Sequence, residues 1–125
     1  MKKIISTEKA PAAIGPYSQA VEAAGLLFIS GQLPIDPATG TMAPAEIKAQ
    51  TEAVIKNLEA ILKSQGLALE NILKTTVYMA DLSQFARMNE VYGKFFTKDP
   101  PARATVEVKA LPKAALVEIE AIAAR

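Results

Sequence analysis

One segment, from about Pro44 to Gln65, has the apolar spacing of a long amphipathic helix, and it constrains the fold more than any other feature. Its apolar and β-branched side chains recur every three or four residues on one face: Ile47, Thr51, Val54, Ile55, Leu58, Ile61 and Leu62. Pro44 suits the first helical turn and Gly66 suits the C-terminal stop. A helix with one apolar face is stable only when another layer covers that face.

The segments on either side of this helix have the two-residue alternation of β-strands. "KKIIST" is a short first strand, and "YSQAVEAAGLLFISG" predicts two strands joined by a tight turn at Ala24-Gly25. "NILKTTVYMAD" predicts a further strand after the helix. Near the C-terminus, "ARATVEVKA" and "ALVEIEAIA" alternate around Leu111–Lys113, which is most simply an antiparallel hairpin.

A second helix is predicted at about Ser83 to Thr97, with Ser83 as its N-cap. One stripe of this helix carries Phe85, Met88, Tyr92, Phe95 and Phe96. The order is therefore strands, helix, strand, helix and two strands, which predicts an α+β fold with two helices on one face of the sheet. "LLFI" is apolar on both faces, so the second face also needs a cover. We expect another copy of the chain to provide it.

Length and charge point to one small globular domain covering residues 1–125. There are 14 Lys plus Arg against 13 Asp plus Glu, so the chain lacks the basic excess that nucleic-acid binding usually needs. No apolar run approaches the ~20 residues of a membrane span, and the first residues lack the apolar core of an export signal. These features indicate a mature cytosolic protein.

The chain contains no Cys and no His. A Cys nucleophile, a Ser-His-Asp triad, a Cys/His zinc site and an imidazole base are therefore excluded. Any acid–base chemistry must use Glu, Asp, Lys or Tyr. The sequence also has no phosphate-binding loop or dinucleotide fingerprint.

In "PPARATVEV", an Arg opens a strand whose other face carries Val106 and Val108. Arg103 and Thr105 share one strand face, and Glu118 falls on the same face if the predicted hairpin pairs odd positions with even ones. Two interpretations stay open. Arg103 and Glu118 form a structural ion pair, or Arg103 binds an anionic ligand while Glu118 handles protons or a water.

Other candidates are weaker taken one at a time. Tyr17 follows a Pro-fixed loop and either faces a pocket or packs. Ser30-Gly31 ends a strand, where Gly frees a backbone N–H for a ligand or makes a simple turn. Asn89 lies on the second helix, where a solvated residue is the default. Glu107 and Glu120 are interpreted as structural or interface carboxylates.

Several separated motifs together resemble the RidA (YjgF) family of reactive-intermediate imine deaminases, over nearly the whole chain and in the family's order. They are "APAAIGPYSQAV", "LLFISGQLPIDPATG", "KTTVYMADLSQFARMNEVY", "PPARATVEV" and "LPKAALVEIEAIA". The resemblance implies a chorismate-mutase-like mixed sheet backed by two helices, and homotrimers with active sites between subunits. It also implies hydrolysis of 2-imino acids, tautomers of the 2-enamino acids released by threonine and serine dehydratases, to 2-keto acids and ammonia, without cofactor or metal.

The resemblance also implies roles for particular residues. Arg103, in the "PAR" motif, would bind the substrate carboxylate, and Glu118 would position and activate the water. Tyr17, Ser30 with Gly31 after it, and Asn89 would line the same pocket. The chain departs from many members at Thr105, where they have Cys, so no thiol can act there.

Three other functions remain as alternatives. A non-catalytic module that senses small carboxylates such as 2-keto acids would need Arg103 but not Glu118. A role in RNA cleavage, described for some relatives, lacks support from charge or from any His. A protein-interaction role would use apolar surface that we expect the trimer interface to occupy.

Overall fold

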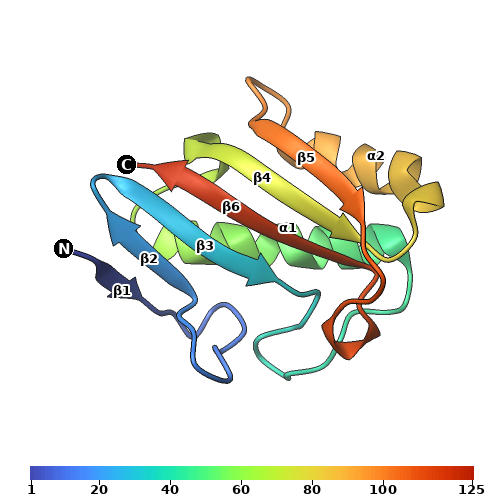
Figure 1. The fold of residues 1–125 in the computed structure, drawn as a ribbon, viewed down its shortest axis with the longest axis horizontal. Helices are drawn as coiled ribbons and strands as arrows, with labels where there is room; N and C mark the ends of the chain where they lie inside the picture. The colour runs from blue at the N-terminus through green and yellow to red at the C-terminus, as the bar shows by residue number, and fades with distance from the viewer.

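The computed structural model describes residues 1–125 as a six-stranded mixed sheet with two helices on one face (Figure 1). The strand order is β1-β2-β3-β6-β4-β5. The strands are β1 (Lys3–Ile5), β2 (Ala20–Ala23), β3 (Leu26–Gln32), β4 (Ile72–Met79), β5 (Ala102–Glu107) and β6 (Val117–Ala124). The helices are α1 (Ile47–Ser64) and α2 (Phe85–Phe95). The predicted single-domain α+β fold is confirmed.

The pairing of the C-terminal strands differs from the prediction. The β2–β3 hairpin forms as expected, with Ala24 and Gly25 at positive φ in its turn. The hairpin predicted between β5 and β6 is wrong, because β4 lies between them. β5 pairs with β4 in parallel, whereas β6 is antiparallel to both β4 and β3. The chain after β5 therefore crosses to the centre of the sheet, and β5 is left as an edge strand.

Both helices begin later than the sequence predicted. Glu46 caps α1 by accepting hydrogen bonds from the backbone N–H groups of Lys48 and Ala49, so Pro44 precedes the helix. Asp81, not Ser83, caps the 3₁₀ turn at Leu82–Gln84 that leads into α2. The stop after α1 is confirmed, because Gly66 has a φ of 71°, a left-handed conformation that suits glycine.

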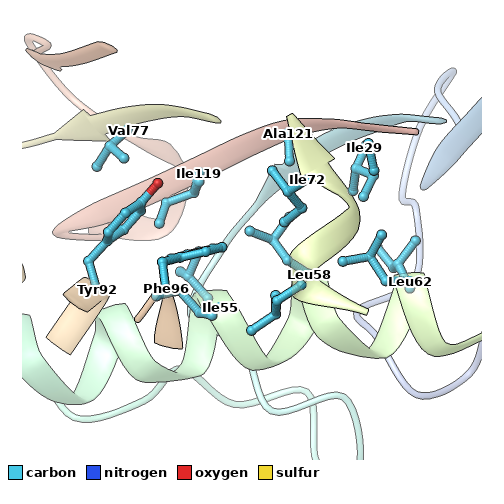
Figure 2. Close-up of a cluster of buried hydrophobic side chains, with 14 of the residues drawn as sticks. Ile29, Ile55, Leu58, Leu62, Ile72, Val77, Tyr92, Phe96, Ile119 and Ala121 are labelled. Atoms are coloured by element: carbon cyan, nitrogen blue, oxygen red, sulfur yellow. The ribbon is translucent and has the colours of Figure 1, made fainter. Parts of the chain in front are cut away.

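The core lies between the helices and the sheet. Figure 2 shows side chains of α1 and α2 pointing toward the strands, and side chains of β3, β4 and β6 pointing back. Every residue on the predicted apolar face of α1 is buried. The predicted stripe holds for Met88 and Tyr92 of α2 and for Phe96 directly after it, whereas Phe85 remains 37% exposed.

The face of the sheet opposite the helices has no cover within the chain (Figure 1). Along β6 every second residue is buried, and the residues between them, from Glu118 to Ala124, are only partly buried. Phe28 is 46% exposed and Val106 is 42% exposed. The open face therefore mixes exposed apolar groups with carboxylates and hydroxyls, as the sequence predicted.

Candidate functional site

Arg103 lies on β5 and extends over α2, on the helix-covered side of the sheet. Its guanidinium carbon is 4.7 Å from the centre of the Tyr92 ring and 5.4 Å from that of Phe85. Its Nη1 donates a 2.7 Å hydrogen bond to Oδ1 of Asn89. Two aromatic rings and one amide oxygen therefore hold this cation.

No carboxylate pairs with Arg103. The ion pairs of the chain involve Lys48, Lys56, Lys63, Arg87 and Arg125. The interpretation of Arg103 and Glu118 as an ion pair within one chain is therefore wrong. A partly buried guanidinium without an anionic partner can bind an anion that comes from outside the chain.

Glu118 lies on the opposite side of the sheet. Thr75 of β4 pairs with Arg103, and Tyr78 of β4 pairs with Glu118. Paired residues share a face, and residues an odd number apart on a strand do not. Thr75 is 1% exposed and faces α2, so Glu118 faces the open side. The hairpin between β5 and β6 does not form. The prediction that Glu118 shares a sheet face with Arg103 and Thr105 is therefore wrong.

Glu118 is only partly exposed, and its surroundings disfavour its charge. Burial raises the pKa of the Glu118 carboxyl, and the charge of Glu120 on the same strand raises it further. The expected effect of a neighbouring Arg, which would keep Glu118 ionised, is absent within one chain. Gly31 of β3 leaves the space that this side chain occupies, because a Cβ at position 31 would lie 2.9 Å from the Glu118 carboxyl carbon.

A recess of about 360 Å³ opens on the same face, and Ser30 and Glu120 are among the residues that line it. The Ser30 hydroxyl donates a 2.6 Å hydrogen bond to the backbone oxygen of Ser18, so it can still accept a bond from a ligand. Tyr17 precedes Ser18 in the N-terminal loop and is 54% exposed. Ser30, Gly31 and Glu118 thus lie on the open face, with Tyr17 on a loop beside it.

A second recess, of about 410 Å³, lies beside Arg103. Its lining residues are Asn89, Tyr92, Gly93, Phe96, Pro100, Pro101 and Arg103. Asn89 is therefore not a merely solvated helix residue. Thr105 lines neither recess, and its hydroxyl is buried without a hydrogen-bond partner.

Three contributions to this region were missed from sequence. Tyr92 and Phe85 belong to the predicted stripe of the second helix, and the structure shows that both also contact Arg103. Gln19 is buried, and its amide bonds Thr7, Ala10 and Pro11, which fixes the loop that carries Tyr17. For Phe85 and Tyr92 the sequence did carry a signal, because Asn89 lies between them at helical spacing and the three side chains therefore share one helix face. Nothing in the sequence marks Gln19.

Glu107 has a structural role, as predicted, since its carboxylate accepts a 2.8 Å hydrogen bond from the backbone N–H of Leu82. No group of three or more potential metal-ligating side chains lies together. None of the helices is both long enough and apolar enough to span a bilayer.

Comparison with known proteins shows the family of this chain. Residues 7–125 match the family model described as Endoribonuclease L-PSP. A RutC family protein of Pyrococcus horikoshii is 54% identical over 98% of both chains. The 2-iminobutanoate/2-iminopropanoate deaminase of Mus musculus is 48% identical, over 98% of this chain and 91% of that protein. The solved structure of E. coli TdcF with bound serine has a TM-score of 0.94 and 45% identity, with 98% of each chain covered. The chain belongs to the family of Endoribonuclease L-PSP, YjgF and RidA proteins.

The relatives from Mus musculus and Bos taurus are named 2-iminobutanoate/2-iminopropanoate deaminases. Other relatives are named only as RutC family proteins.

Proposed function

We propose that this protein hydrolyses 2-imino acids, such as 2-iminobutanoate and 2-iminopropanoate, to 2-keto acids and ammonia. The observation that carries the proposal is Arg103, a guanidinium held by Phe85, Asn89 and Tyr92 but without any carboxylate partner. A small carboxylate would complete its pairing. The relative TdcF was solved with serine, which has such a carboxylate, and the mouse relative is named as a deaminase.

The second half of the proposed site is Glu118. In the reaction a water oxygen bonds to C2 of the imine while Glu118 accepts a proton from that water. The π electrons of the protonated C=N bond move to nitrogen, which leaves a hydroxyl and an amino group on C2. Glu118 passes its proton to this nitrogen and, as the C–N bond breaks, takes the hydroxyl proton, so that ammonia leaves and the C=O of the keto acid forms. The last proton is then released to ammonia or solvent.

Arg103 and Glu118 lie on opposite sides of one sheet, so one chain does not hold a complete site. We propose that the site forms between two subunits of a homotrimer, with Arg103, Asn89 and Thr105 from one subunit. The next subunit supplies Glu118, together with Tyr17, Ser30 and Gly31. The uncovered open face supports this arrangement, because its exposed apolar groups need a partner.

A coupled assay tests the reaction. A threonine dehydratase generates the imine in the presence of semicarbazide, which traps whatever is not hydrolysed. We expect the wild-type protein to divert flux to 2-ketobutyrate, and Arg103→Ala and Glu118→Ala to lose this effect while assembly is unchanged. Full activity in Arg103→Ala would contradict the assignment. Binding of 2-ketobutyrate without imine turnover would instead favour a carboxylate sensor.

A further inference from the structure

One face of α2 presents an aromatic ring, an amide and a second aromatic ring. Phe85, Asn89 and Tyr92 are spaced by four and three residues, so their side chains lie one above another on the helix. This face carries Arg103 of β5. It belongs to α2, on the helix-covered side of the sheet, and is separate from Ser30 and Gly31 within β3 on the open face.

Each of the three side chains contacts the guanidinium in its own way. Tyr92 and Phe85 offer ring faces at 4.7 Å and 5.4 Å, both within the ~6 Å range of cation–π attraction. Asn89 accepts the 2.7 Å hydrogen bond from Nη1. The guanidinium is thus fixed both in position, by the rings, and in rotation, by the amide oxygen.

Tyr92 is itself rigidly held. It is 5% exposed, its hydroxyl lies 2.7 Å from Oγ1 of Thr75, and its ring centre lies 4.5 Å from that of Phe96. Phe85, by contrast, is 37% exposed. An exposed Phe in the apolar stripe of a helix is explained if its ring covers Arg103 rather than the core.

We propose that Phe85, Asn89 and Tyr92 are positioning residues that hold the Arg103 guanidinium in advance of ligand binding. We call these three residues the arginine cradle. A free Arg loses rotamer entropy when it binds an anion, and the cradle removes most of that cost beforehand. Only one of the five guanidinium donors is used within the chain, so the others remain for a carboxylate. The identity of that ligand rests on the proposed function, whereas the cradle does not.

Two measurements test the cradle. In side-chain ¹⁵N NMR spectra, assigned by loss of signals in Arg103→Lys, we expect separate Nη signals for Arg103 because rotation about its Cζ–Nη bonds is slow. Asn89→Ala and Tyr92→Leu should average these signals. The same variants should weaken 2-ketobutyrate binding, measured by calorimetry, by about tenfold. In the imine assay they should raise KM far more than they change kcat.

Conservative and matched variants separate positioning from general damage. Tyr92→Phe keeps the ring and should bind within about twofold of wild type, although it loses the Thr75 bond. Lys94→Ala, on an exposed position of the same helix, should change neither measurement. Averaged Nη signals in the wild type, or wild-type binding by Asn89→Ala and Tyr92→Leu, would overturn the cradle. Wild-type binding by Arg103→Ala would overturn the proposed function instead, and the NMR result would then decide on the cradle alone.

Discussion

Gly31 and Glu118 are in close contact across β3 and β6. A Cβ at position 31 would lie 2.9 Å from the Glu118 carboxyl carbon and 3.1 Å from its Cγ, and closer still to one carboxylate oxygen. The β3–β6 register shifts between Ile29 and Gln32, which is where Gly31 lies. The glycine is therefore explained by the side chain beside it, not by an unusual backbone angle.

Gly31→Ala should displace the Glu118 side chain and reduce imine hydrolysis at least tenfold, while the fold is retained. The reason is steric, so the effect should depend on Glu118. In a double-mutant cycle followed by chemical denaturation, Gly31→Ala should destabilise the wild type but have much less effect on Glu118→Ala. Equal destabilisation in both backgrounds would show that the contact is not the cause.

In the Arg103→Ala background, where no partner guanidinium faces Glu118, Glu118→Gln should make the protein more stable at neutral pH. The folded-state pKa of Glu118 is raised, so its charged form is disfavoured by folding, and Gln removes that penalty. Below the ordinary glutamate pKa both the folded and the unfolded states are protonated, so the advantage should disappear there. Thermal melts of the Arg103→Ala protein with and without Glu118→Gln, from acidic to neutral pH, check the sign of the stability difference between them. A stability gain that stayed constant with pH would contradict the raised pKa.

Thr105→Val should be neutral or stabilising, by up to about 1 kcal/mol, because the Thr105 hydroxyl is buried without a partner. Thr75→Val is the matched control. Its hydroxyl is also buried but lies 2.7 Å from the Tyr92 hydroxyl, so its loss should cost about 1–2 kcal/mol. Urea denaturation of the two variants distinguishes them. A large loss of stability in Thr105→Val would reveal a partner that one chain lacks.

The local sequence pattern was enough to predict the helices and most strands. The buried face of α1, for example, follows directly from the spacing of residues such as Val54 and Leu58. Strand partners could not be predicted in this way, because alternation is the same whichever neighbour a strand has. The succession β4, α2, β5 was nevertheless a signal for a parallel crossover, which the hairpin prediction overlooked.

The candidate site was harder to predict than the fold. The sequence singles out Arg103 and Glu118 as candidates, but their relation depends on the sheet order, which places them on opposite faces. The contacts of Arg103 with Phe85 and Tyr92 depend on how α2 packs against β5. The reason for a glycine at position 31 becomes clear only when β6, which carries Glu118, is known to lie beside β3.

The most direct test of the account is to mix two inactive variants. Arg103→Ala and Glu118→Ala are unfolded together, refolded as mixed assemblies, and assayed for imine hydrolysis. If each site takes Arg103 from one subunit and Glu118 from the next, about a quarter of the sites in a random equal mixture regain both residues, and activity returns accordingly. If both residues of a site come from one chain, every site stays defective. A mixture as inactive as its parents, with assembly verified by sedimentation, would contradict the account.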